Sequence, residues 1–163
     1  MPDGTVRAFQ ACVRAPFATL GITATDTHVT GLRFLDPSVP ALAPPRNTIA
    51  YLACVQIQAY LEDGSTVFDV PLKLSGTFHR LAVWEAMRRI PAGSTRSYGE
   101  LAQELGSSAR AVGGACGANP IPLIVPCHRI IAANHSLGGF MGASSEGFEL
   151  SIKRWLLGHE GVI

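Results

Sequence analysis

Residues 97–116 read SYGELAQELGSSARAVGGAC, and this stretch predicts two short helices joined by a tight turn. Ser97 and Glu100 have the spacing of a capping box, in which each side chain binds the backbone N–H of the other residue at the start of a helix. Gly106 can end that helix, and Ser107 or Ser108 can begin the next one. Two short helices with a glycine-containing turn between them are typical of a helix-turn-helix unit.

The second of these helices consists almost entirely of alanine and glycine, with Arg110 as the main exception. Small side chains let a helix approach another surface closely. That surface can be the protein core, in which case the composition is structural. It can also be the minor groove of DNA, which is only ~6 Å wide and admits little bulk. Arg110 would then enter the duplex, where a guanidinium can hydrogen-bond and stack.

Helical signals surround this pair of helices in the second half of the chain. Thr77 can cap a helix in which apolar residues recur at helical spacing as far as Met87. We therefore expect residues 76–163 to form a mostly α-helical domain that contains the helix-turn-helix.

The first half of the chain has a different pattern. Its segments 6–13, 17–24 and 28–35 carry β-branched and aromatic residues and predict a small antiparallel meander. A helix should follow, capped by Asn47 or Thr48 and ended by Asp63-Gly64, and residues 67–70 should add an edge strand. We expect residues 1–75 to form an α/β domain built from this sheet and helix.

Composition and charge narrow the functional classes. The 163 residues are 47% hydrophobic and 15% charged, which argues against disorder, and no apolar run reaches the ~18 residues of a membrane span. The start of the chain lacks the pattern of a secretory signal, so we expect a cytosolic protein. Residues 76–163 hold eight Lys or Arg against six Asp or Glu, a mildly basic balance that is compatible with a nucleic-acid partner.

Four cysteines are spread along the chain without a CxxC pair, at Cys12, Cys54, Cys116 and Cys127. Neither a zinc ribbon nor a thioredoxin-like motif is supported. The even number would permit two disulfides, but free thiols fit a chain without a secretion signal better. Cys12 and Cys54 lie in apolar surroundings and are expected to be buried.

Cys127 follows a proline-rich run, NPIPLIVPCHR at residues 119–129. Prolines fix their own φ and favour extended backbone at the preceding residue, so the direction of the thiol should be set in advance. The pair Cys127-His128 can be structural or catalytic. On extended backbone the two side chains would point to opposite faces, so proton transfer between them would need a bridging water. A thiol titrates near ~8.5 and needs a base or a positive field, and Glu160 is a candidate for orienting His128.

Several motifs together resemble one family. The run around Pro126-Cys127-His128-Arg129 looks like the active-site signature of the O6-alkylguanine-DNA alkyltransferases, also called methylated-DNA–protein-cysteine methyltransferases. The stretches 97–101, 109–115, 138–140 and 153–161 follow in that family's order. The motifs cover about residues 77–161, whereas the first half resembles the family's ribonuclease-H-like N-terminal domain only in its pattern of elements.

The resemblance implies roles for individual residues. Cys127 would be the nucleophile and alkyl acceptor, His128 the base acting through water, and Glu160 the residue that orients His128. Asn119 would brace the active-site turn, and Tyr98 would rotate a DNA phosphate and donate a proton toward the purine. The DNA-binding positions would be Tyr98, Ala109, Arg110, Ala111, Gly113 and Gly114, with Arg110 filling the space of the flipped base. The substrate pocket would be lined by Pro126, Ile130, Phe140 and Met141.

The same resemblance implies a stoichiometric, irreversible transfer of an alkyl group from O6-alkylguanine, or O4-alkylthymine, in duplex DNA to Cys127. It implies minor-groove binding, base flipping, and no cofactor or obligate protein partner, while the absence of a zinc-ligand set predicts no metal. The protein would act as a monomer that can cluster along DNA, in a bacterial or archaeal type of cytosol with the nucleoid. Some family members hold a structural zinc, but Cys12, His28 and His79 are not spaced as ligands.

Three departures and two alternative functions accompany this interpretation. Residues 141–152 form a longer segment than in compact family members, and Met141 replaces a commonly small residue. The turn at residues 106–108 is shorter than in some relatives. A DNA-binding protein that recognises damage without reacting is one alternative, and a cysteine hydrolase using Cys127, His128 and Glu160 is the other.

Overall fold

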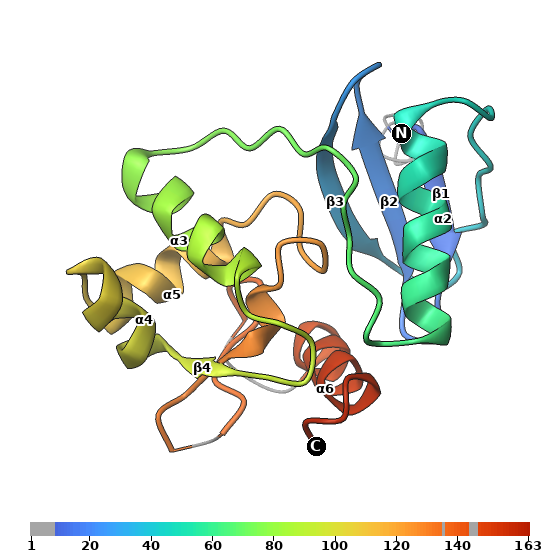
Figure 1. Ribbon diagram of the computed structural model, residues 1–163. Helices are drawn as coiled ribbons and strands as arrows, with labels where there is room; N and C mark the ends of the chain where they lie inside the picture. The colour runs from blue at the N-terminus through green and yellow to red at the C-terminus, as the bar shows by residue number, and fades with distance from the viewer. Residues whose placement is uncertain (1–8, 135, 144–146) are drawn as a thin grey trace. The chain divides into compact units, whose positions relative to one another are not determined.

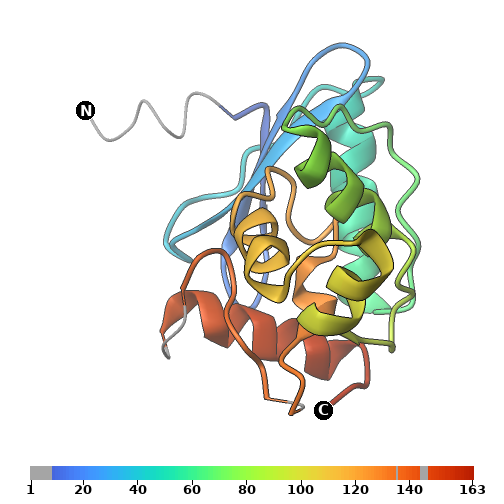
Figure 2. The ribbon, with the colours of Figure 1, turned by 90° about the vertical axis from the view of Figure 1, so that its left-hand side faces the viewer.

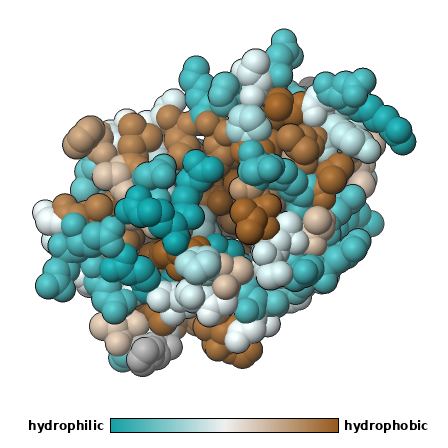
Figure 3. Space-filling model, in the orientation of Figure 1, coloured by the Kyte–Doolittle hydropathy of each residue, from teal (hydrophilic) through white to brown (hydrophobic). Residues whose placement is uncertain are grey.

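The computed structural model describes residues 9–134, 136–143 and 147–163. The chain divides into two compact units, residues 1–74 and residues 75–163 (Figure 1). Within the described residues, no helix combines the length and the apolar character needed to cross a membrane. On the face shown in Figure 3, hydrophilic and hydrophobic side chains are mixed.

The first unit contains a three-stranded antiparallel sheet in the order β1-β2-β3. Its strands are β1 (Ala11–Arg14), β2 (Thr19–Ala24) and β3 (Val29–Leu35). Cys12 pairs with Gly21 and Leu20 pairs with Phe34, so the predicted meander is confirmed. The prediction began the first strand at residue 6; the observed strand begins at Ala11, and residues 6–8 lie outside the described part.

One helix, α2 (Ile49–Glu62), packs on this sheet (Figure 1). Thr48 begins it as predicted, because its side-chain oxygen accepts the backbone N–H of Tyr51 at 3.1 Å. The helix ends before Asp63. Its buried residues share one face, which the sheet covers: Ala50, Ala53, Cys54, Ile57 and Tyr60.

The edge strand predicted at residues 67–70 is wrong. The backbone N–H groups of Asp69 and Val70 donate to the side-chain oxygen of Gln56 on α2, both at 3.1 Å. A helix side chain therefore takes the hydrogen bonds that a neighbouring strand would have supplied. The only bridge to the sheet in this part of the described chain lies later, where Leu72 pairs with Val29.

The second unit is mostly helical, as predicted. It contains α3 (Phe78–Arg88), α4 (Tyr98–Leu105), α5 (Ala109–Gly117) and α6 (Phe148–His159). The capping box of Ser97 and Glu100 is present, and Gly106 ends α4 with a φ of 63°. Ser108 caps α5. Figures 1 and 2 both show α4 and α5 beside each other, joined by the short turn.

A hydrogen bond fixes α5 against α3. The indole N–H of Trp84, which is almost completely buried, donates to the backbone oxygen of Ala115 at 2.8 Å. Because Ala115 and its neighbours on α5 are small, the two helices can approach closely. The small residues of α5 thus serve the packing of one face, while Ala109, Arg110, Ala111 and Gly114 remain exposed on the other.

The second unit also contains a short parallel pair of strands that the sequence did not predict. Here β4 (Arg96–Ser97) pairs with β5 (Ile130–Ile131). Strand β4 leads directly into Tyr98, and β5 follows the 3-10 turn η1 (Cys127–Arg129). Two residues per strand give no sequence signal, yet this pairing places the start of α4 beside the turn that carries Cys127.

Candidate active site

Cys127 lies at the start of the buried 3-10 turn η1, and its side chain is only 3% exposed. This corrects the expectation of extended backbone at Cys127-His128. The N–H of Cys127 donates to the oxygen of Val125 at 2.8 Å, and the N–H of Arg129 donates to the oxygen of Pro126 at 3.0 Å. Consecutive residues of a 3-10 helix are about 120° apart around its axis, so the side chains of Cys127 and His128 still point in different directions.

Asn119 closes the loop that precedes this turn. Its side-chain nitrogen donates to the oxygen of Val125 at 2.8 Å, and its side-chain oxygen accepts the N–H of Ile121 at 3.0 Å. The side chain is buried, and Leu123 between these points adopts a positive φ of 77°. The amide thus joins both ends of a tight loop directly before Cys127, the place where the sequence analysis put a bracing residue.

Glu160, at the C-terminal end of α6, joins His128 and Arg129 in a buried network. Its Oε2 accepts from His128 Nε2 at 2.8 Å and from Arg129 Nη2 at 3.0 Å, while its Oε1 accepts from Arg129 Nε at 2.9 Å. Arg129 also donates to the backbone oxygen of Ile90 at 2.6 Å. The carboxylate is fully buried, so these three charge-assisted bonds hold it in one position.

This network determines which nitrogen of His128 can accept a proton. Burial lowers the pKa of His128, although the hydrogen bond that it donates to Glu160 acts in the opposite direction, so the resting imidazole is neutral. A carboxylate is only an acceptor, and Nε2 must therefore carry the hydrogen. The other nitrogen, Nδ1, is buried and has no hydrogen-bond partner among the described residues. His128 therefore presents a free lone pair at Nδ1, as a general base requires.

The thiol itself is protonated at rest. Burial raises the pKa of Cys127 to about 11, while the hydrogen bond from Asn119 and the positive charge of Lys153 act against this rise. Lys153, on α6, is completely buried and donates from Nζ to the oxygens of Ile130 at 2.6 Å and Gly139 at 2.8 Å. Burial lowers the pKa of Lys153 to about 8. The thiol thus needs a base to ionise, and a buried cation lies close enough to favour the anion.

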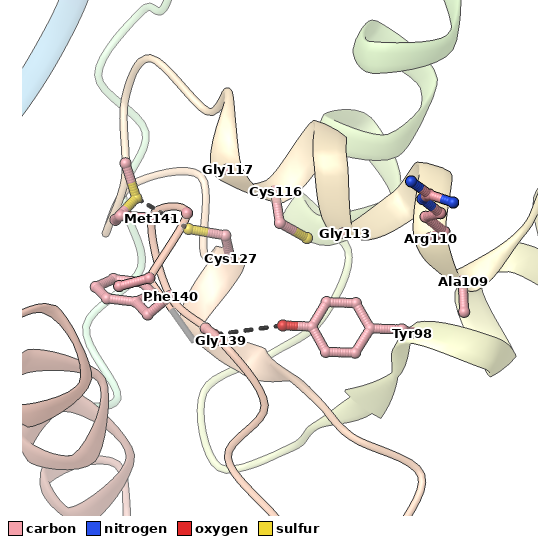
Figure 4. Close-up of a pocket in the computed structure, with 12 residues that line it drawn as sticks. Tyr98, Ala109, Arg110, Gly113, Cys116, Gly117, Cys127, Gly139, Phe140 and Met141 are labelled. Carbon is pink, nitrogen blue, oxygen red and sulfur yellow. Dashed lines mark hydrogen bonds between the residues drawn. The ribbon is translucent and has the colours of Figure 1, made fainter. Parts of the chain in front are cut away.

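A cavity of about 410 Å³ opens in front of Cys127 (Figure 4). Its lining comes from the start of α4, from α5, from the turn η1 that carries Cys127, and from the loop before α6. The lining residues are Tyr98, Ala109, Arg110, Gly113, Cys116, Gly117, Cys127, Gly139, Phe140, Met141, Gly142 and Ala143.

Tyr98 forms one wall of this cavity. Its hydroxyl donates to the oxygen of Gly139 at 3.3 Å, and burial raises the pKa of Tyr98 to about 12, so the phenol keeps its proton at neutral pH. Gly138, with a φ of 69°, lies so near that a Cβ there would stand 2.9 Å from the Tyr98 ring. The loop can therefore pass Tyr98 only because this residue is glycine.

Arg110 lies at the mouth of the cavity. The side chain is exposed, and it forms no ion pair or hydrogen bond with any described residue. Its guanidinium is therefore available to a ligand outside the protein.

Comparison with known proteins identifies the family. Residues 78–162 match the family model described as the DNA-binding domain of 6-O-methylguanine DNA methyltransferase. A methylated-DNA–protein-cysteine methyltransferase of Mycolicibacterium paratuberculosis is 41% identical over 138 residues, which are 80% of this chain and 82% of the relative. This chain belongs to the methylated-DNA–protein-cysteine methyltransferase family.

Other members of the family support the same assignment. An inducible methylated-DNA–protein-cysteine methyltransferase of Bacillus subtilis is 47% identical over 98 residues, which are 59% of this chain and 52% of the relative. The crystal structure of Mycobacterium tuberculosis OGT in complex with DNA superposes with a TM-score of 0.76 at 38% identity and covers 91% of this chain and 90% of its own. The small antiparallel sheet with its helices therefore matches the fold of this methyltransferase family.

The structure brings most of the predicted site residues of this family member to one place. Tyr98, Ala109, Arg110, Gly113, Cys127, Phe140 and Met141 line the cavity, and Asn119, His128 and Glu160 stand behind Cys127. Pro126 and Ile130 were predicted to line the substrate pocket, but they flank η1, are buried in the protein and do not line the cavity. Ala111 and Gly114, predicted as DNA-binding positions, are exposed on α5.

Sequence reasoning missed seven residues of the site. Two lie behind the cavity: Arg129 holds Glu160, and Lys153 places a buried cation behind the loop at Gly139. The other five line the cavity: Cys116, Gly117, Gly139, Gly142 and Ala143. A signal for Lys153 existed, because it stands three positions from both Leu150 and Leu156 on the buried face of α6. A lysine on an apolar helix face is rarely buried without a partner. Within the described residues, no group of three His, Cys, Asp or Glu side chains is arranged to hold a metal ion.

Proposed function

We propose that this family member repairs alkylated duplex DNA by transferring the alkyl group from O6 of guanine, or from O4 of thymine, to its own Cys127. One observation carries the proposal: a buried thiol faces a cavity of about 410 Å³ and stands in the same turn as a histidine held by Glu160 with Nδ1 free. The cavity volume lies within the range of small-molecule sites, ~300–1,000 Å³.

The proposed chemistry balances without a cofactor. His128 Nδ1 takes the proton of the Cys127 thiol through a water molecule, and the sulfur attacks the alkyl carbon in line. The new S–C bond forms as the C–O6 bond breaks, and the electron pair of that bond remains on the guanine. Tyr98, protonated at neutral pH, lies across the cavity and donates its proton to the purine. His128 then releases the proton it took up to solvent and Tyr98 regains one, so in balance the thiol loses one proton and the repaired base gains one.

The thioether formed in this reaction would limit each protein molecule to a single turnover. A thioether has no good leaving group, and neither the imidazole of His128 nor water can displace the carbon from sulfur. Each protein molecule would therefore repair one lesion. Repeated turnover of an ester or amide, as in a cysteine hydrolase, would need donors placed to stabilise an oxyanion.

The DNA-binding part of the proposal rests on α5. Its exposed residues are small apart from Arg110, which has no hydrogen-bond or ion-pair partner among the described residues, so the helix can enter a minor groove that is only ~6 Å wide. With α4 it would form a helix-turn-helix, and Arg110 would occupy the space of a nucleotide flipped into the cavity. Extruding a base costs a few kcal/mol, least for a damaged base. The protein would act as a monomer that can cluster along DNA in the nucleoid-containing cytosol.

The assignment of the two domains completes the proposal. Residues 1–75 would correspond to the family's ribonuclease-H-like N-terminal domain, and residues 76–163 to its DNA-binding and alkyl-transfer domain. Every residue placed in the site lies in the second of these. We therefore expect the chemistry to depend on the second domain.

Intact-protein mass spectrometry tests the proposal directly. After incubation with a duplex that contains one O6-methylguanine, the protein should gain the mass of one CH₂ unit. Cys127→Ser should gain nothing. Cys54→Ser is the matched control, because Cys54 is a buried free cysteine on α2 outside the cavity and its replacement should leave the transfer intact. Binding of the damaged duplex without any mass increase would instead support a protein that only recognises damage.

A further inference from the structure

Met141 stands at a strained position of the loop that closes the cavity. The N–H of Phe140 donates to the oxygen of Ala143 at 2.8 Å, and the N–H of Ala143 donates back to the oxygen of Phe140 at 2.9 Å. The two residues between them have positive φ angles, 51° at Met141 and 86° at Gly142. These angles are those of a type I′ turn.

Methionine is an unfavourable choice at this place in a type I′ turn. Both central residues of such a turn need φ > 0, and asparagine, aspartate and glycine are strongly preferred there. A longer L-residue in the left-handed region brings its Cβ too close to the backbone. A strained residue beside a reactive group is a reason to ask what its side chain does.

The side chain of Met141 lies directly over the nucleophile. Its Sδ is 3.9 Å from the Sγ of Cys127, with the thiol as the donor, and Figure 4 shows the two sulfur atoms facing each other. Met141 is among the residues that line the cavity. The thioether therefore occupies part of the space immediately in front of the attacking atom.

This space is also where the transferred group has to sit. A carbon poised for attack lies about 3–3.5 Å from the nucleophile, close to the distance at which Met141 Sδ now stands. A methyl group therefore needs little space beyond this distance. Any atoms beyond that carbon must compete with the Met141 side chain, which can yield in part because methionine is unbranched and flexible.

We infer that Met141 is a specificity-determining residue, which narrows the site around the transferred group so that methyl adducts react much faster than bulky ones. The inference rests on the proposed function, because it assumes that Cys127 is the alkyl acceptor. It concerns the size of the group transferred and adds nothing to the chemistry of the step.

The test compares single-turnover rates on two duplexes that differ only in the adduct, O6-methylguanine or O6-benzylguanine. Met141→Asn suits the turn and removes the thioether, whereas Met141→Leu keeps the bulk and serves as the matched control. We expect Met141→Asn to raise the benzyl-to-methyl rate ratio about tenfold or more, since one methylene in an apolar pocket changes selectivity ~10–200-fold. Met141→Leu should leave the ratio near that of the wild type.

The outcomes separate this inference from the proposed function. Wild-type methyl transfer to Cys127 with an unchanged ratio in Met141→Asn would overturn the inference alone. An equal rise in Met141→Leu would also overturn it, because size would then not be the cause. Absence of methyl transfer in the wild type would overturn both. Circular dichroism checks that each variant is folded, and Met141→Gly, which also suits the turn, repeats the comparison if the asparagine variant is unstable.

Discussion

Replacing Glu160 with glutamine should slow alkyl transfer by about a hundredfold or more while the protein stays folded. Glutamine has the shape of glutamate but carries one oxygen and one NH₂ group. If its NH₂ group took the place of Oε2, it would face the donors of both His128 and Arg129. We expect the other orientation, with NH₂ toward Arg129 Nε, because only the bond now made at Oε1 is then lost.

The loss of one hydrogen bond determines how much stability Glu160→Gln loses. One hydrogen bond to a charged group contributes about 1.5–3 kcal/mol, which is smaller than the ~5–15 kcal/mol by which most proteins are stable. The cost to the reaction has a different origin. Glu160 raises the pKa of His128, whereas burial, Arg129 and Lys153 all lower it. Without the carboxylate charge the imidazole becomes a weaker base, and positioned general bases contribute ~10²–10⁴-fold.

The assay is a rapid-quench, single-turnover measurement with a duplex that contains O6-methylguanine, accompanied by urea unfolding. Glu85→Gln is the matched control, because Glu85 is exposed on α3, and its rate should equal that of the wild type. A Glu160→Gln protein that is folded and reacts at the wild-type rate would refute the assignment of His128 as the base oriented by Glu160.

Three further predictions follow from the same contacts. Arg110→Ala should weaken repair of duplex lesions while reaction with the free alkylated base changes little. Replacement of the exposed Arg80 by alanine is the control, and an equal loss of rate on both substrates would mean that Arg110 serves the fold. Asn119→Ala should cost about 1–3 kcal/mol, because it leaves the buried N–H of Ile121 unpaired and removes one of the two hydrogen bonds that the oxygen of Val125 accepts. Urea unfolding beside Asn134→Ala, an exposed turn residue, measures this cost, and a cost equal to that of the control would contradict the prediction. Stability should fall as the pH drops below ~6.5, the ordinary pKa of histidine. The folded protein lowers the pKa of His128, so below this pH the unfolded chain binds a proton that the folded protein does not. A His128→Gln variant that loses as much stability over the same pH range would contradict this cause.

The parts of the fold that local chemistry determines could be predicted from the sequence. Ser97 and Glu100 bind each other's backbone, Gly106 accepts a left-handed φ, and Thr48 and Thr77 cap their helices through their own side chains. Each of these features depends on residues a few positions apart. Sequence patterns therefore located α2, α3, α4 and α5.

Features that depend on distant partners could not be predicted in this way. Residues 67–70 have a strand-like composition, but Gln56 on α2 takes their backbone hydrogen bonds. The β4–β5 pair has two residues on each side, and only the tertiary structure brings them together. The same holds for the 3-10 turn at Cys127, because the bond from Asn119 to Val125 and the pairing of β5 hold that turn.

The site also combines residues that the motifs predicted with contacts that depend on distant partners. The motifs pointed to Cys127, His128 and Glu160, and the structure shows the hydrogen bond that joins the last two. The burial of Lys153 and the position of Met141 over the thiol depend on how α6 and the loop at residues 140–143 pack. The helical spacing of Lys153 on the buried face of α6 indicates its burial but not its partners, and Met141 has no local pattern that reveals its contact with the thiol.

The stoichiometry and the site of alkylation test the central claim most directly. With methylated duplex in excess, peptide mapping should find one methyl group per protein molecule, on the peptide that contains Cys127, and methyl loss from the DNA should stop at one equivalent. A methyl group on another residue, or continued loss of methyl groups from the DNA beyond one equivalent, would contradict the account.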